Sequence, residues 1–244
     1  MSSIAVCISG EIRTFRETHK SIREFIPDAD IFIHTWSNSE NSWKDTVQGF
    51  KLVEQNTDMQ ELIDIYQPED IMIDSPIDCF EYEDAKLPDM YKDQKRKGWD
   101  KPAKHNYLPM YYGILQADLL RRDSGKSYDM VVRTRPDIKI VNELHMYNGN
   151  GVYYTPMDPL IEDWPIDYWS EIRANDFFAW GDEYSMECYS ERWYDITYDL
   201  QEEVETYGNI LGSETSLKNY LDRYCIPCYS IFPNCAEIVR ELYV

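Results

Sequence analysis

The chain has 244 residues, of which 43% are hydrophobic and 14% aromatic, and its 45 acidic against 24 basic residues give a formal charge of −21. This hydrophobic content excludes intrinsic disorder and suffices for the core of one large domain. The acidic surface would repel nucleic-acid backbones and anionic membranes, so neither is an expected partner. An anionic ligand would need a local cluster of arginines or a divalent metal at its site.

No segment is long enough for a membrane span, and the apolar run 4–8 is too short for a secretory signal. The six cysteines are scattered, several in apolar contexts typical of buried free thiols, which favours a cytoplasmic location. Cys225 and Cys228 have metal-ligand spacing, but no second Cys or His pair completes a tetrahedral set. Zinc or redox chemistry is therefore not expected there.

Apolar runs typical of strands alternate along the chain with apolar stripes typical of helices. The strand-like runs cover residues 4–8, 31–36, 71–73, 130–132, 152–154, 177–180 and 226–232. Helical spacing marks residues 14–26, 59–66, 108–119, 186–204 (one long helix or two shorter ones) and 213–224. This alternation predicts an α/β fold, one domain over residues 1–244 with a mostly parallel central sheet covered by helices.

Two helix starts carry capping signals. Thr14 and Glu17 have the spacing of a capping box, in which each side chain bonds the other residue's backbone N–H. Ser213 can cap the last helix and leaves Glu214 in its first turn, where a carboxylate complements the helix dipole.

The loop between the first strand and the first helix has the composition of a phosphate-binding loop. It offers small residues, a cation and a helix amino terminus through Ser9, Gly10, Arg13 and Thr14. It is neither a Walker loop nor a dinucleotide fingerprint, so the composition alone does not define a nucleotide site.

Two further features each have a functional and a structural interpretation. His34, at the end of the second strand, could contact a ligand, although a bond to neighbouring backbone is the expected role. Residues 86–104 hold seven of the 24 basic residues amid two prolines and a glycine, which indicates a loop or excursion. That segment is either a basic flap over a phosphate or an acidic acceptor or, as we expect, a solvated charge run.

Polar chemistry begins where the apolar run 130–132 ends. Arg133, Arg135 and Asp137 follow it within five residues, and Pro136 removes a backbone donor and fixes φ, so the chain must leave regular sheet pairing there. The carboxyl end of a central strand is where ligands bind in open α/β sheets. The alternative is a strand end with a solvated Arg–Asp pair.

The chain resembles, along nearly its whole length, a family of bacterial and phage-encoded glycosyltransferases of the GT-A type that is associated with surface-polysaccharide genes. The stretches that carry the resemblance are residues 7–14, 30–36, 128–137 and 175–181 and the helix that starts at 213–214. The most distinctive of them is Arg133-Thr-Arg-Pro-Asp137. The resemblance implies a single GT-A-like, Rossmann-like domain and a nucleotide-sugar donor.

In ordinary GT-A enzymes an Asp-x-Asp motif at this strand end holds a divalent metal on the donor's diphosphate. Here Arg135 stands two residues before Asp137. By this resemblance Asp137 is the candidate ligand for Mn²⁺ or Mg²⁺ or for the donor, while Arg13, Arg133 and Arg135 are candidates for neutralising the phosphates.

The resemblance also suggests where an acceptor would bind. Residues 156–175, rich in aspartate, proline and aromatic side chains, have the character of an acceptor-side loop. Asp176 and Glu214 are candidates for the catalytic base or for carboxylates that bind the acceptor, the alternatives being a cap at a strand entry and a partner of the helix dipole.

The expected activity is therefore transfer of a sugar from a nucleotide-sugar donor to a glycan or another hydroxyl acceptor. One alternative is a non-catalytic protein that uses the same fold to bind a sugar or nucleotide. Another is a structural component of a virion or assembly.

Overall fold

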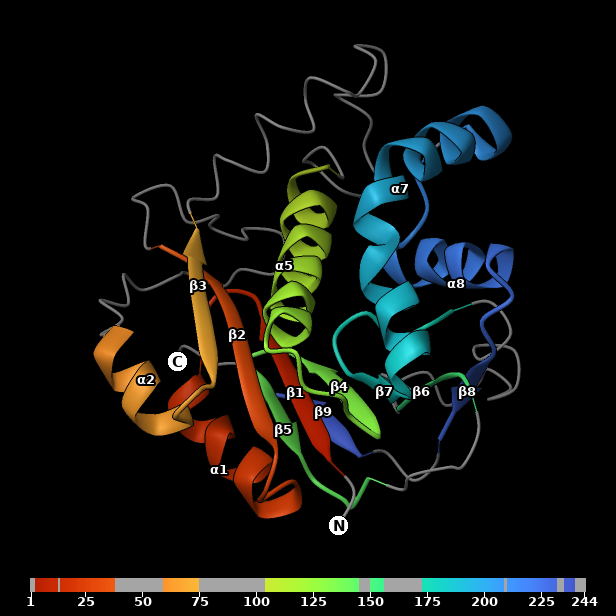
Figure 1. Cartoon of the computed structure of the whole chain (residues 1–244). Helices are drawn as coiled ribbons and strands as arrows, with labels where there is room; N and C mark the ends of the chain where they lie inside the picture. The colour runs from red at the N-terminus through yellow and green to blue at the C-terminus, as the bar shows by residue number, and fades with distance from the viewer. Residues whose placement is uncertain are drawn as a thin grey trace.

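The computed structural model describes residues 3–12, 14–37, 59–74, 104–144, 150–155, 173–208, 210–231 and 235–239. The strands are β1 (Ile4–Ser9), β2 (Asp30–Trp36), β3 (Asp70–Asp74), β4 (Met130–Thr134), β5 (Ile138–Ile140), β6 (Val152–Tyr154), β7 (Ala179–Gly181), β8 (Cys228–Ser230) and β9 (Ala236–Ile238). The helices are α1 (Phe15–Phe25), α2 (Met59–Tyr66), α5 (Lys104–Asp123), α7 (Glu183–Tyr207) and α8 (Ser213–Arg223) (Figure 1).

Within these residues the chain forms a seven-stranded sheet in the order β3-β2-β1-β4-β7-β6-β8 and a separate pair, β5 with β9. Strands β3, β2, β1 and β4 run parallel to one another, and β8 runs parallel to β6. Only β7 is antiparallel to its partners β4 and β6 among the described strands of this sheet. The predicted α/β fold with a mostly parallel sheet is confirmed.

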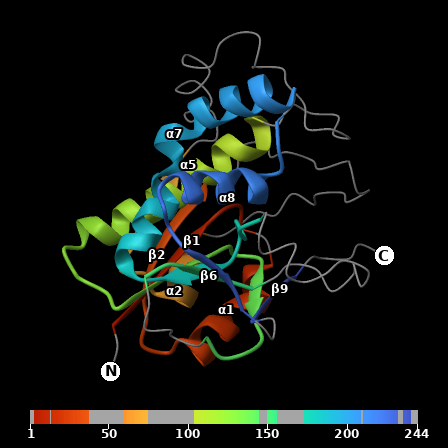
Figure 2. The same ribbon diagram turned by 90° about the vertical axis from the view of Figure 1, so that its right-hand side faces the viewer.

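Helices cover both faces of the sheet, as the apolar composition of its central strands requires. Val6 and Ile8 of β1 belong to a buried cluster with α1 and α2, whereas Ala5 and Cys7 belong to a second one with α5, α7 and α8. Figure 2 shows these two groups of helices on opposite sides of the sheet. None of the described helices combines the length and the apolar character that a membrane crossing needs.

The change of face creates a topological switch point between β1 and β4. The chain leaves β1 through α1 on one face to reach β2, whereas α5, on the other face, leads into β4 on the opposite side of β1. Ligands in open α/β sheets bind outside the carboxyl ends of the strands at such a point. The basic segment 86–104 lies outside the described residues, except for Lys104 at the start of α5.

Two predicted strands are shifted or shortened. The amide oxygen of Asn175 accepts hydrogen bonds from the N–H groups of Phe177 and Phe178, both at 2.9 Å, so these residues form a turn and β7 begins only at Ala179. The last predicted strand, 226–232, shrinks to β8. Strand β9 was not predicted, because three residues paired with an equally short partner give little periodicity.

Of the two predicted helix caps, Thr14 does occupy the N-cap position of α1 but without a capping bond from its side chain, and Ser213 is not the cap of α8. Thr14 adopts the left-handed conformation (φ 40°) and makes no side-chain cap, because its hydroxyl donates instead to the carbonyl of Val239 at 3.2 Å. The residue that caps α8 is Gly212, which has extended backbone, and Ser213 is already helical. The capping side chain in this half of the chain is Asp182, which accepts from the N–H of Ser185 at 3.0 Å and starts α7.

The close approach of Gly181 in β7 to Gly151, just before β6, gives a prediction about stability. A Cβ on Gly181 would overlap the backbone carbonyl oxygen of Gly151, which cannot move without breaking the pairing of β6. We expect Gly181→Ala to destabilise the fold by roughly 2–4 kcal/mol in urea unfolding. Gly208→Ala is the matched control: it has a positive φ of 72° but open space around it, so we expect a loss of only about 1 kcal/mol. Equal losses in the two variants would contradict this account of Gly181.

Candidate functional site

The loops that follow β1 and β4 lie side by side at the switch point. Ile8 and Thr134 are paired in register at the ends of the two strands. Gly10 follows β1 with φ 133°, a conformation that favours glycine, and a Cβ built there would lie 3.6 Å from the ring of Pro136. The Gly10 carbonyl accepts a bond from the hydroxyl of Thr35 at 2.9 Å, which ties the first loop to β2.

The backbone of the second loop is fixed from two directions. From α1, the hydroxyl of Thr18 donates to the carbonyl of Pro136 at 2.5 Å, and the hydroxyl of Ser21 accepts from the N–H of Ile140 at 3.0 Å. Beyond β9, the N–H of Val239 donates to the carbonyl of Asp137 at 2.8 Å. The side chains of this loop therefore project from a rigid frame.

Arg133 is a buried cation inside the sheet. It pairs in register with Cys7 of β1 and Ala179 of β7, and its side chain is 2% exposed. Its Nε and Nη1 atoms have no hydrogen-bond partner among the described residues. Burial lowers the pKa of Arg133 to about 10, against the opposing effects of Tyr189 and Asp176, so the guanidinium keeps its charge at neutral pH. A phosphate outside the strand would feel this charge chiefly through its field.

Arg135 and Asp137 form a two-pronged ion pair. Nε of Arg135 donates to Oδ1 of Asp137 at 2.8 Å, and Nη2 donates to Oδ2 at 2.5 Å. The Asp137 side chain is 5% exposed, whereas that of Arg135 is 29% exposed. Arg135 is thus held by the carboxylate at its back and remains accessible to a ligand.

This pairing bears on the predicted metal site. Both oxygens of Asp137 already accept a bond from Arg135, so a metal ion at Asp137 would have to share the carboxylate with a guanidinium that repels it. The described part of the chain contains no group of three or more His, Cys, Asp or Glu side chains that could hold a metal. The geometry thus fits the structural interpretation of Asp137, with the loop held by its ion pair, better than it fits a metal ligand.

Asp176 is buried at the same edge of the sheet. It precedes β7, which runs antiparallel to β4, so it lies near the carboxyl end of β4, and it is 5% exposed. Burial raises the pKa of Asp176 to about 6, and the charge of Glu214 acts in the same direction, while Ser213, Arg135 and Arg133 oppose the shift. Asp176 is therefore a carboxyl group that changes protonation just below neutral pH.

The start of α8 brings Glu214 to Asp176. The carbonyl of Glu214 accepts a bond from the N–H of Ala174 at 2.9 Å, and the hydroxyl of Ser213 lies 3.4 Å from Glu214 Oε2. Glu214 is only partly buried. The five residues Arg133, Arg135, Asp137, Asp176 and Glu214 are named the arginine–carboxylate cluster below.

Of the other predicted site residues, some lie at the switch point and some lie outside the described residues. Ser9 ends β1 at the switch point, and its buried hydroxyl has no bonding partner among the described residues. Thr14 lies at the start of α1, but its hydroxyl donates to the carbonyl of Val239. Arg13 and residues 156–172 of the predicted acceptor loop lie outside the described residues.

His34 takes part in a different cluster, at the carboxyl ends of β2 and β3. Its Nε2 lies 3.3 Å from Oδ2 of Asp74, which also accepts from the hydroxyl of Tyr112 at 2.9 Å. The expected bond to neighbouring backbone is therefore wrong, since a side-chain carboxylate takes that place. Burial lowers the pKa of His34, although Asp74 acts in the opposite direction. A fully buried, neutral imidazole fits a structural role.

The sequence placed Tyr189 in the apolar stripe of residues 186–204 as a core position and assigned no role to Arg192. Tyr189 of α7 donates to the carbonyl of Asn175 at 2.9 Å, and Arg192, one turn on, is fully buried. The sequence does contain a sign that Arg192 is buried. The residue falls three positions after Tyr189 and four before Ile196, on the apolar face of α7. A charged residue on a buried helix face requires a partner, so its position there points to a network.

Compared with models of protein families and with curated protein sequences, the chain gives no match. Among solved structures it is similar to that of a galactosyltransferase, LgtC, in complex with donor and acceptor sugar analogues. The TM-score is 0.43, the sequence identity is 14%, and the likeness covers 97% of this chain and 86% of that chain. A likeness at this level does not assign a function.

The Arg135–Asp137 pair gives a prediction that separates its structural role from a metal-binding one. We expect Asp137→Asn to lower the free energy of unfolding by about 1–3 kcal/mol, because it leaves a partly buried guanidinium with a neutral acceptor. The control is Glu237→Gln in the exposed Lys139–Glu237 pair on the same small sheet, which should change it by less than about 0.5 kcal/mol. An Asp137→Asn variant as stable as the unmodified protein in urea unfolding would exclude the structural role.

Asp176 gives a prediction about pH and stability. Its pKa of about 6 in the fold exceeds that of an unfolded aspartate, about 3.9. Its stabilising protonation is therefore complete below pH 4 and is lost as the pH rises through 6. We therefore compare the free energy of unfolding of Asp176→Asn with that of the unmodified protein in urea. We expect this difference to shift in favour of the variant by about 2–3 kcal/mol between pH 4 and pH 7.

Only the difference between the two proteins carries this effect, because other carboxylates titrate in the same range. Asp123→Asn, at an exposed position on α5, controls for the loss of one negative charge. A difference between the Asp176→Asn variant and the unmodified protein that stayed constant from pH 4 to pH 7 would rule out the raised pKa.

Proposed function

We propose that the protein transfers a sugar from a nucleotide-diphosphate donor to a hydroxyl group of an acceptor. The observation that carries the proposal is the arginine–carboxylate cluster at the switch point between β1 and β4. There a buried cation and an accessible cation stand beside a buried carboxyl group that titrates near pH 6. The resemblance of the sequence to GT-A glycosyltransferases adds the substrate class.

Both charges suit such a transfer. The leaving diphosphate gains negative charge as the bond to the sugar breaks, and preorganised cations stabilise that charge in a water-poor site. Arg135 offers an accessible guanidinium for direct bonds, and Arg133 contributes its field from inside the sheet. No step in this proposal requires a metal ion at Asp137.

The carboxylates provide the acceptor side of the proposal. A hydroxyl nucleophile gains reactivity when a base removes its proton during attack, and a base with a pKa near the working pH does so best. Asp176 has that property. Glu214, partly exposed in the first turn of α8, can orient the acceptor through its hydroxyl groups.

A non-catalytic protein that binds a nucleotide or sugar is the second candidate. The observation that favours it is the ion pair of Asp137 with Arg135, which engages the one carboxylate of the Arg133–Asp137 stretch, where ordinary GT-A enzymes hold their metal. Turnover of a nucleotide sugar distinguishes the two candidates, because binding alone raises thermal stability without releasing nucleotide.

The first test is a panel of nucleotide sugars, nucleoside diphosphates and monophosphates, measured by thermal shift and calorimetry with and without Mn²⁺. We expect the diphosphate to bind more tightly than the monophosphate and to lose affinity with salt, because both cations act on the phosphates. Arg135→Ala should cost roughly 1.5–3 kcal/mol of affinity for the diphosphate. Equal affinities for the two nucleotides would count against the proposed donor site.

The second test is the pH dependence of turnover with a nucleotide sugar found in that panel. If Asp176 is the base, kcat/KM rises with pH through about 6 and reaches a plateau above it. Asp176→Asn should abolish turnover while the diphosphate still binds. Full activity in that variant would remove Asp176 from the mechanism.

A further inference from the structure

The two carboxylates of the arginine–carboxylate cluster repel one another, so other contacts must hold them together. Glu214 raises the pKa of Asp176 through its charge, second only to the effect of burial. Glu214 lies in the first turn of α8, and its partly exposed side chain accepts a bond from the hydroxyl of Ser213 at 3.4 Å. The position of this helix turn therefore decides how strongly Glu214 acts on Asp176.

The segment that leads into α8 is held by bonds from α5 and α7. The hydroxyl of Tyr107 donates to the carbonyl of Leu211, and that of Tyr111 donates to the carbonyl of Ser213 at 3.1 Å. The carboxylate of Glu203 accepts from the N–H of Leu211 at 2.9 Å. Three bonds thus fix the backbone just before Glu214.

Arg192 of α7 joins these contacts to the first turn of α8. Its side chain is fully buried, its Nη2 donates to the hydroxyl of Ser216, and that hydroxyl donates in turn to Glu203. The guanidinium carbon lies 4.0 Å from the centre of the Tyr111 ring. Arg192 therefore contacts Ser216, two residues after Glu214, and Tyr111, whose hydroxyl bonds the carbonyl just before Glu214.

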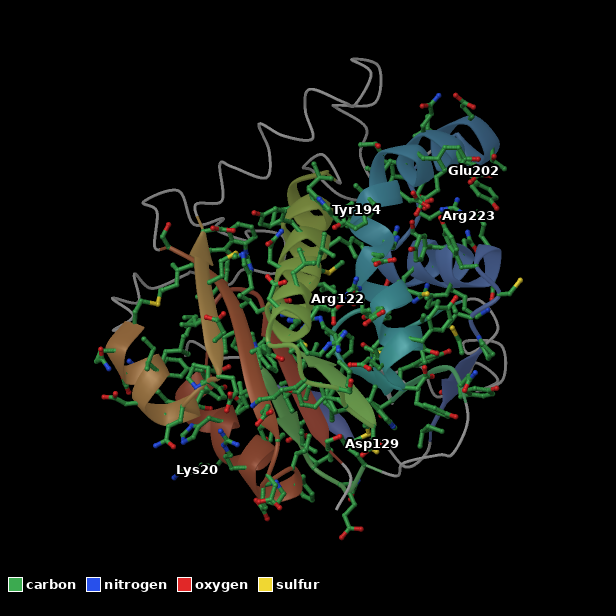
Figure 3. The ribbon with its side chains drawn as sticks, viewed as in Figure 1. Lys20, Arg122, Asp129, Tyr194, Glu202 and Arg223 are labelled. Carbon is green, nitrogen blue, oxygen red and sulfur yellow. The ribbon has the colours of Figure 1, made fainter. Side chains whose placement is uncertain are left out.

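A second arginine, Arg223 of α8, joins this network through Asp199 of α7. Asp199 lies 3.4 Å from Nε of Arg192 and accepts from Nη2 of Arg223 at 2.6 Å. Arg223 also lies 3.4 Å from Glu202, and Figure 3 shows these two residues close together where α7 and α8 meet. Burial raises the pKa of Asp199 and of Glu203. Keeping a cation and two acids in the interior is costly unless each has partners.

We propose that Arg192 is a positioning residue for the arginine–carboxylate cluster, which holds the first turn of α8 so that Glu214 stays beside Asp176. Its importance for catalysis rests on the proposed function, whereas its effect on Asp176 does not. The other groups that face Asp176 are Arg133 of β4, Arg135 after it, and the phenols of Tyr189 on α7 and Tyr111 on α5. The hydroxyl of Ser213 also faces Asp176 and does belong to the turn that Arg192 holds. Its hydrogen bond lowers the pKa of Asp176, but by less than the charge of Glu214 raises it, so the net effect of this turn is upward.

The test is a titration of the Asp176 carboxyl carbon by NMR in the full chain, with the signal assigned through Asp176→Asn. Arg192→Met removes the guanidinium and keeps the bulk, so the turn can relax and Glu214 can retreat from Asp176. A like charge that moves back by ~2 Å from ~6 Å shifts a pKa by about half a unit at an effective dielectric constant of ~20. We expect the Asp176 midpoint to fall by about that amount.

The sign of the shift separates positioning from a direct electrostatic effect. If Arg192 acted on Asp176 only as a nearby cation, its removal would raise the midpoint, because an anion would lose a favourable charge. Ser216→Ala is the second variant. It changes no charge and removes the hydroxyl through which Arg192 holds α8, so it should lower the midpoint as Arg192→Met does.

Arg121→Met is the matched control for loss of a buried arginine. Arg121 is 1% exposed and bonds Asp118 of α5 and Glu183 and Glu187 of α7, beside Arg122, which Figure 3 shows between these two helices. We expect this variant to lose stability without moving the Asp176 midpoint. A midpoint that rises or stays constant in both Arg192→Met and Ser216→Ala would overturn the proposal.

Kinetics then connect the inference to the proposed function. Arg192→Met should lower kcat for a nucleotide sugar and shift the rise of the pH profile downward, and KM for the donor should stay unchanged because no donor contact is lost. If the NMR midpoint moves but no nucleotide sugar is turned over, the positioning role stands and the proposed function fails. If turnover exists but the midpoint does not move, only the positioning role fails.

Discussion

The buried charge of Arg133 is the constraint on which the rest of the site depends. A guanidinium inside strand β4, 2% exposed and with two nitrogens lacking partners among the described residues, has given up most of its hydration. Such a charge is tolerated only where nearby anions and dipoles compensate it. Asp176 and Tyr189 lie close enough to act on it electrostatically. The position of this one cation thus explains why a carboxylate can be buried at the start of β7.

Helix α7 links the polar groups around Arg133 to the helix α8 in the outer layer. One face of this helix presents Tyr189 to the sheet and Arg192 to α8, while the acids near its start pair with the arginines of α5. Polar residues on its buried face satisfy one another in networks that fix the orientation of the helices around it.

Periodicity predicted most of the fold, because long apolar runs and stripes report burial directly. It failed where a residue is paired with something distant in sequence. Thr14 was expected to cap α1, but its hydroxyl reaches a carbonyl 225 residues away, and His34 pairs with a carboxylate 40 residues on.

The candidate site divides in the same way. The polar run near the end of β4 was readable from the sequence, although the strand continues through Arg133 to Thr134, two residues beyond the apolar run. The closed pair of Arg135 with Asp137, and the role of Arg192, depend on side-chain geometry and on contacts between helices, which no local pattern records.

The two-stranded sheet of β5 and β9 has a consequence for how the site is assembled. The loop at Asp137 is held by the N–H of Val239, and β5 pairs with residues 236–238, about a hundred positions later in the chain. Closing so long a loop is entropically expensive and comes late in folding. The parallel half of the sheet can form early from the first strands, whereas the loop bearing Arg135, which α1 holds through Thr18 and Ser21, gains its bond from Val239 only after that distant segment docks. During synthesis, the contacts that fix the loop of this accessible cation would therefore be completed late.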